Sequence, residues 1–119
     1  MKYWIQRADF SAVDREAPDA DQLMAVLEKH DWASELRYRA VLEQAHAEWC
    51  DPGLGIVPED GRLLHLCPQE DGSISCHYKF MKQRRMLGIT YAQTPVLKTS
   101  QLSSMAQAPE VIRLFLAND

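Results

Sequence analysis

The centre of the chain reads LGIVPEDGRLLHLCPQEDGSISCHYKF over residues 54–80. Short apolar runs alternate here with two similar turns, a pattern typical of antiparallel strands joined by tight hairpins. Each turn contains Glu-Asp-Gly, and a three-residue hairpin loop places its last residue in the left-handed region that glycine favours. The pattern therefore predicts strands at 54–57, 62–67 and 73–82, separated by turns that end at Gly61 and Gly72.

The loop length decides the register of the second hairpin. If residues 70–72 form a three-residue loop, Leu66 lies opposite Cys76 and Leu64 lies opposite Tyr78. A two-residue loop would turn both leucines away from Ile74, because a slip of one residue moves every side chain to the other face. The three-residue loop is favoured, since it gathers one apolar face from Leu64, Leu66, Ile74, Cys76, Tyr78 and Phe80.

Beyond Phe80 the chain is predicted to turn at residues 83–85 and to return as a strand over residues 86–92. Thr94-Pro95 is expected to interrupt that strand, because proline has no N–H for strand pairing. Residues 96–99 then suit a short edge strand. A last helix is expected to begin at Pro109, and its apolar surface indicates that it packs on the sheet.

The N-terminal part is predicted to begin with a strand and a helix. Residues 3–10 are rich in aromatic and β-favouring types and suggest a strand, whereas the polar residues 11–18 suggest a loop. A helix is expected to open at Pro18 or Asp19, where acidic residues in the first turn complement the helix dipole. A break is expected at residues 30–31.

A second helix is predicted over residues 33–49, ended by Asp51-Pro52-Gly53. The surrounding Ala, Glu, Gln and Arg favour helix over strand. An apolar stripe at helical spacing supports it and consists of Tyr38, Val41, Leu42, Ala45 and Trp49. Together these patterns predict a single α+β domain over residues 1–119. Its sheet would be an antiparallel β-meander of four to six strands, with two helices from the N-terminal half and a C-terminal helix packed on it.

Composition and length narrow the class of protein. The chain has 119 residues, of which 46% are hydrophobic and 25% charged, as in ordinary globular proteins. This length excludes a full Rossmann dehydrogenase, a TIM barrel or a kinase. No signal-peptide core and no apolar run of membrane length is present, so a cytoplasmic location is expected. Three cysteines, an odd number, favour free thiols over disulfides.

The formal net charge of −4 is unevenly distributed. Residues 9–35 hold eight acidic and two basic residues, whereas residues 72–109 hold five basic residues and no acidic one. Such asymmetry bears on partners and association rates rather than on the fold. The acidic residues either form the solvent-exposed surface of a loop and a helix, or they form a surface that binds a basic partner. For the second case the predicted binding residues are Asp14, Glu16, Asp19, Asp21, Glu59, Asp60, Glu70 and Asp71.

A histidine pair is the first candidate for chemistry. In the favoured register His65 lies opposite His77 on the outer face of the sheet, near Cys67 and Lys79. Paired imidazoles beside a lysine suit general acid–base catalysis such as metal-free phosphodiester cleavage, and with Cys67 they would form an incomplete zinc site. The alternative is a solvated sheet face that carries two histidines. No zinc-motif spacing is present, so neither a metal nor a cofactor is expected.

A basic run follows the histidine pair. Its cations, Lys79, Lys82, Arg84 and Arg85, could contact phosphate, or they could protect a hairpin end from edge-to-edge association. Four cations on an acidic protein are a small footprint for a nucleic acid, so a nucleic acid is not the expected partner. A small nucleic-acid-binding or hydrolytic domain that uses these residues with His65 and His77 is the alternative hypothesis for function.

The chain contains no glycine-rich phosphate loop, no Gly-x-Ser-x-Gly elbow and no His-Glu-x-x-His motif. In its α+β pattern, its acidic balance and the stretch from Leu54 to Leu66, it resembles small bacterial immunity proteins, which neutralise toxins delivered to neighbouring cells. The resemblance implies a non-enzymatic inhibitor that binds a basic toxin, such as a nuclease, through an acidic surface. A self-associating structural subunit is a further alternative.

Overall fold

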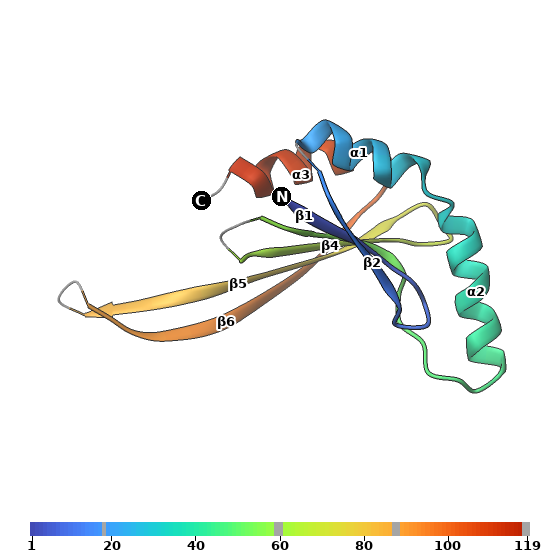
Figure 1. Ribbon diagram of the computed structural model, residues 1–119, viewed down its shortest axis with the longest axis horizontal. Coiled ribbons are helices and arrows are strands. Elements are labelled where there is room, and N and C mark those ends of the chain that lie inside the picture. The colour runs from blue at the N-terminus through green and yellow to red at the C-terminus, as the bar shows by residue number, and fades with distance from the viewer. Residues whose placement is uncertain (18, 59–60, 87–88, 118–119) are drawn as a thin grey trace.

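The computed structural model describes residues 1–17, 19–58, 61–86 and 89–117. These residues form a six-stranded antiparallel sheet with three α-helices and one 3-10 helix (Figure 1). The elements in chain order are β1 (Lys2–Gln6), β2 (Ala12–Glu16), α1 (Ala20–Lys29), α2 (Trp32–Gln44), β3 (Gly53–Val57), β4 (Leu63–Pro68), β5 (Ile74–Met86), β6 (Ile89–Leu102), η1 (Met105–Gln107) and α3 (Ala108–Ala117). The strand order β2-β1-β3-β4-β5-β6 confirms the predicted α+β fold with an antiparallel meander.

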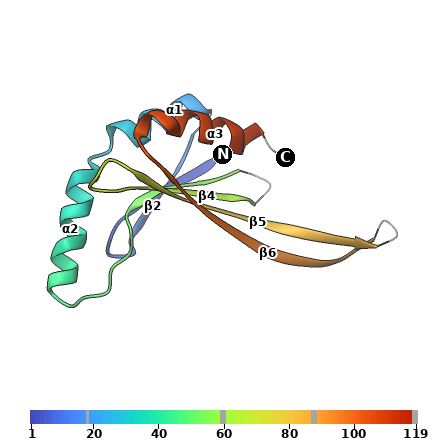
Figure 2. The same cartoon turned by 180° about the vertical axis from the view of Figure 1, so that it is seen from behind.

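The core lies between one face of the sheet and the helices α1 and α3 (Figures 1 and 2). Leu54, Leu66 and Ile74 are at most 1% exposed on the sheet side. Leu23 and Leu27 of α1 and Ile112 of α3 are 0% exposed on the helix side. The Phe115 ring meets the Tyr78 ring edge-on, with centroids 5.6 Å apart. The predicted apolar face of the meander is therefore the face that the helices cover.

The predicted register of the β4–β5 hairpin is confirmed. Leu66 pairs with Cys76, Leu64 with Tyr78 and His65 with His77. The loop closes with a hydrogen bond of 2.8 Å that the Gln69 N–H donates to the Ser73 carbonyl. Gly72 has φ +87° and Gly61 has φ +82°, so both glycines adopt the left-handed backbone that the turns require.

The predicted break at residues 30–31 between the two N-terminal helices is confirmed. The Asp19 carboxylate accepts a hydrogen bond from the Gln22 N–H and caps α1, and Asp31 caps α2 in the same way through the Ser34 N–H. His30 ends α1. The break therefore comes from two successive capping sites rather than from a proline or a glycine.

The predicted loop over residues 11–18 is wrong, because residues 12–16 form strand β2. The first strand also ends at Gln6 rather than at residue 10, and the chain reverses at once, with the Arg7 N–H donating to the Ser11 carbonyl at 2.8 Å. Every residue of β2 is exposed. An edge strand that buries nothing shows no apolar alternation, so its sequence looks like a loop.

The predicted turn at residues 83–85 is also wrong. These residues belong to β5, which continues to Met86, and β6 runs without interruption from Ile89 to Leu102. Pro95 lies within β6 and pairs with Met81. Because β6 is the edge strand of the sheet, a residue without an N–H is tolerated there.

Helix α2 ends at Gln44, five residues before the predicted end. His46 has a positive φ of 57°, the Ala47 N–H donates to the Leu42 carbonyl, and the His46 N–H donates to the Glu43 carbonyl. These bonds form a Schellman motif with histidine in the position that glycine usually takes. The predicted stripe is not a buried face, since Val41 is 59% and Trp49 is 40% exposed.

Candidate functional site

The sheet order separates the two charged regions of the sequence in space. Strand β2, with Asp14 and Glu16, forms one edge of the sheet, and β6 forms the other. The acid-free region with its five basic residues falls largely on the β5–β6 hairpin, which projects from the rest of the molecule (Figure 1). The acidic residues of β2 and the basic residues of the β5–β6 hairpin therefore lie towards opposite edges of the sheet.

Four of the eight predicted acidic residues form what we call the acidic edge: Asp14, Glu16, Asp19 and Asp21. Asp14 pairs with Trp4, and Glu16 pairs with Lys2, so both carboxylates lie on the sheet face opposite the helices. Arg15 is the one basic residue of this segment, and it pairs with the buried Tyr3 on the other face. Glu16 is 74% exposed and lies 3.9 Å from the N-terminal amino group.

Two further predicted acids, Glu70 and Asp71, do not join the acidic edge. Glu70 and Asp71 lie in the β4–β5 turn, at the other end of the strands. Hydrogen bonds from the Ser73 hydroxyl and the Ser73 N–H lower the pKa of the exposed Asp71 carboxyl. Asp71 thus has a structural role as a turn cap. Glu59 and Asp60 lie outside the described residues.

The open face of the sheet, opposite α1 and α3, carries a row of rings that we call the imidazole row: Trp4, His65 and His77. In register, Trp4 pairs with Gly55, Gly55 with His65, and His65 with His77, so the row crosses β1, β3, β4 and β5. The ring centroids of Trp4 and His65 are 6.2 Å apart, and those of His65 and His77 are also 6.2 Å apart. The predicted histidine pair therefore exists, but within a longer row.

Sequence reasoning missed Trp4 and Gly55 as members of this row. A Cβ atom built on Gly55 would lie 2.2 Å from the Trp4 ring, so the indole lies flat across the glycine to reach His65. A glycine inside a strand is the signal that could have revealed this, because it marks a site where another group approaches the backbone closely.

The environment of His65 and Cys67 favours the uncharged form of each side chain, which is the deprotonated imidazole for His65 and the protonated thiol for Cys67. Burial, followed by the neighbouring His77, lowers the pKa of His65. Burial raises the pKa of the Cys67 thiol to about 12, although its sulfur lies only 3.6 Å from His65 Nδ1. A nucleophilic or metal-binding cysteine needs a thiolate, and this site disfavours one.

The predicted basic run lies along β5 and extends to the distal end of the β5–β6 hairpin. Lys79 is exposed on β5, two residues beyond His77. Lys82, Arg84 and Arg85 follow within the same strand and pair with Thr94, Ala92 and Thr90. The ladder shifts register between Arg84 and Arg85. The cations are therefore spread along the hairpin instead of meeting the imidazole row at one point.

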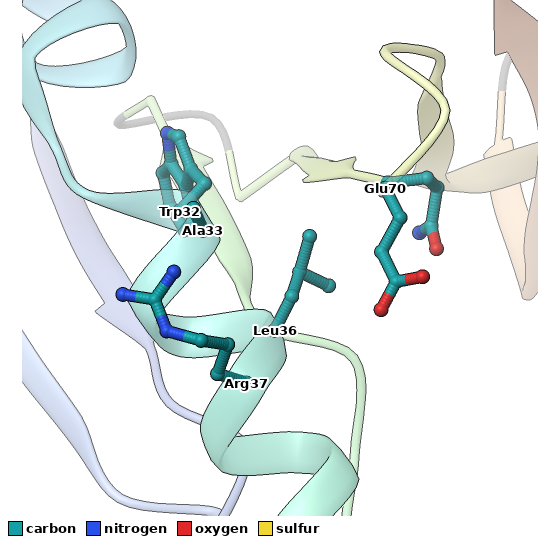
Figure 3. Close-up of a pocket in the computed structure, with 6 residues that line it drawn as sticks. Trp32, Ala33, Leu36, Arg37 and Glu70 are labelled. Carbon is teal, nitrogen blue, oxygen red and sulfur yellow. The ribbon is translucent and has the colours of Figure 1, made fainter.

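A pocket of about 350 Å³ separates α2 from the β4–β5 turn (Figure 3). Its walls are Trp32, Ala33, Leu36, Arg37, Gln69 and Glu70. Trp32 and Leu36 are each 7% exposed, and the Trp32 indole N–H donates to the Leu27 carbonyl at 2.7 Å. The apolar wall of this pocket is thus also part of the attachment of α2, and sequence reasoning did not single it out.

Helix α2 is held to the β1–β2 turn by polar contacts. The buried Glu35 carboxylate lies 3.3 Å from Arg7 Nε and 3.5 Å from His30 Nε2. The Tyr38 hydroxyl donates to the Asp9 carboxylate at 3.1 Å. Arg39, which lines a second cavity of about 410 Å³ beside the β4–β5 turn, is already paired with Asp51 at 2.6 Å.

No family model matches the chain, and neither the curated proteins nor the solved structures give a match. Within residues 1–17, 19–58, 61–86 and 89–117, no three His, Cys, Asp or Glu side chains are grouped so that they could hold a metal ion. None of the helices described in these ranges is long and apolar enough to cross a membrane.

Proposed function

We propose that this chain is a non-enzymatic protein-binding domain whose acidic edge binds a basic partner protein. The observation that carries the proposal is the placement of Asp14 and Glu16 on an exposed edge strand that leads directly into Asp19 and Asp21 at the start of α1. The matching functional class is an immunity-type inhibitor that acts in the bacterial cytoplasm on a basic toxin such as a nuclease.

Electrostatics favours this class. A concentrated negative field accelerates the encounter with a basic partner from about 10⁵–10⁶ M⁻¹s⁻¹ towards 10⁸ M⁻¹s⁻¹ or more at low salt. It also matches a surface that has evolved to bind phosphate. The five basic residues of the acid-free region lie towards the other edge of the sheet and do not neutralise the acidic edge. Its neighbouring positive charges are those of Lys2, Arg15 and the N-terminal amino group.

The test is capture of a partner from a lysate of the source cells on the immobilised chain. The variant D14K/E16K/D21K reverses three exposed charges of the acidic edge, and Asp19 is kept because it caps α1. We expect the wild type to retain a basic protein that elutes as salt is raised. The variant should not retain that protein. Addition of the wild-type chain should suppress the toxic activity of the captured protein.

The matched control is E48K/E70K/E110K, which makes the same change in net charge at exposed positions elsewhere. It should retain the partner. Equal loss from both variants, or retention of a partner that is not basic, would contradict the proposal. Glu70 also makes this control a test of the β4–β5 turn as a rival binding site.

The imidazole row supports a second candidate function, the binding of single-stranded nucleic acid. Its partly exposed rings lie on an open sheet face beside the exposed Lys79. Aromatic faces stack on bases, and cations contact the phosphates. We expect H77Q/K79Q to weaken binding of a labelled single-stranded RNA, measured by fluorescence anisotropy at low salt. K29Q/H46N is the control, because it removes an exposed lysine from α1 and an exposed histidine after α2. No binding by the wild type would exclude this function.

A further inference from the structure

The described sheet has three stretches of strand with an unpaired side, and they differ in charge. Strand β2 carries Asp14, Arg15 and Glu16 in succession. The distal part of β5, which extends beyond the six residues that pair with β4, carries three cations within residues 80–86. Strand β6 carries a single charge, Lys98, in fourteen residues. Charged side chains are what protect an edge from pairing with another chain, so β6 is the unprotected edge.

The part of β6 that can accept a new strand lies next to the sheet body. Pro95 has no N–H, which limits pairing around it. Residues 96–102 contain no proline, and the five residues 97–101 are all exposed. Leu97 is 65% exposed, the largest value among the exposed large apolar side chains of the described residues. This segment, Val96–Leu102, is named the β6 edge.

We propose that the β6 edge pairs antiparallel with the β6 edge of a second copy of this chain. A two-fold axis through Thr99 would place Val96 opposite Leu102 and Leu97 opposite Gln101. Lys98 would then face Ser100 rather than the Lys98 of the other copy. A self-complementary contact of this kind closes after two copies, and it covers the β6 edge of both copies.

Self-complementarity is the reason for choosing a second copy as the occupant, because the two-fold register pairs apolar Val96 with apolar Leu102 and keeps the two Lys98 side chains from lying directly opposite each other. The cations of distal β5 lie one strand away from the shared seam in each copy, so the arrangement does not bring them into direct opposition. The acidic edge remains at the outer end of the joined sheet, so this contact does not depend on the proposed inhibitor function.

The test measures association by sedimentation equilibrium up to hundreds of micromolar. We expect a reversible dimer, and L97K/T99K should raise its dissociation constant by about tenfold or more. L114K places one lysine on another exposed leucine, which lies on α3 and is 55% exposed, and it should leave the dimer unchanged. A wild type that stays monomeric over this range, or equal weakening by L114K, would overturn the proposal.

A cross-link tests the position of the axis. Residues opposite each other in an antiparallel pair have Cα atoms about 4.5–5.5 Å apart, which suits a disulfide. Under mild oxidation T99C should form a covalent dimer, while the wild type with its native cysteines and R113C should not. A dimer that withstands L97K/T99K and does not cross-link through T99C uses another surface, and the proposal then fails.

Discussion

Successive residues of a strand point to opposite faces of the sheet, and β4 shows most directly how the two faces differ. Leu64 and Leu66 face α1 and α3, and Leu66 is 0% exposed. His65 lies between them and faces away from these helices, with its ring near those of Trp4 and His77. One face therefore holds the apolar contacts that stabilise the fold, and the other holds a polar and aromatic row whose members are positioned by register. Substitutions on the two faces should differ in size and in kind.

The largest effect is expected on the covered face. Leu66→Ala removes a fully buried side chain and leaves a cavity, so the free energy of unfolding should fall by about 2–5 kcal/mol. Leu114→Ala, on the exposed side of α3, should change it by no more than about 0.5 kcal/mol. Urea denaturation monitored by circular dichroism measures both. Similar losses from the two variants would mean that the covered face is not the main core.

On the open face, Gly55→Ala should act through Trp4. The new Cβ would overlap the indole at 2.2 Å, and displacing the ring should cost about 1–3 kcal/mol. In a Trp4→Ala background the same substitution should cost much less, because the clash is absent. A double-mutant cycle from denaturation curves gives the coupling between the two positions. Additive effects would show that the indole does not lie across Gly55.

Alkaline pH should weaken the fold through Cys67. Its folded pKa is raised to about 12 from 9.0, so the folded state favours the neutral thiol. This contribution is complete below pH 9 and is lost as the pH rises through the folded pKa, at about 1.4 kcal/mol per pH unit. Cys67→Ala should make the decline in unfolding free energy above pH 9 shallower. An unchanged slope would contradict the burial of this thiol.

The smallest effect concerns the titration of His65. Burial and the neighbouring His77 lower its pKa, so its contribution to stability is present above the unfolded pKa and is lost as the pH falls through the folded pKa. His77→Gln removes one of these causes and should raise the pKa of His65, observed by NMR titration of its ring protons. His46→Asn, at the exposed end of α2, is the control and should leave that pKa unchanged.

Much of the meander and of the histidine pair was predictable, because local signals agreed there. The apolar alternation and the glycine in the hairpin loop favoured the three-residue loop, whose register places His65 opposite His77. The helix starts were predictable for the same reason, since Asp19 and Asp31 cap helices through contacts within three residues. Where a signal lies within a few residues, the sequence was sufficient.

The remaining features depend on contacts that the local sequence does not show. Strand β2 exists because β1 offers it a pairing partner, and its fully exposed residues carry no pattern. Strand β6 continues through Pro95 because it has β5 on one side only. The position of Trp4 over Gly55 joins residues from distant parts of the chain. Asp14 and Glu16 of the acidic edge lie on β2, so their position could not be predicted from the sequence.

The pairing of β1 with β3 has a consequence for how quickly the chain reaches this fold. Neighbouring strands elsewhere in the sheet are consecutive in the chain, whereas the residues paired between β1 and β3 are roughly fifty positions apart. Closing such a long loop costs entropy before any contact is gained, and distant contacts slow folding. The hairpin β1–β2 and the meander β3–β6 can therefore form early as separate units. Their docking along the β1–β3 seam, with both helices in the connection, is the step expected to limit the folding rate.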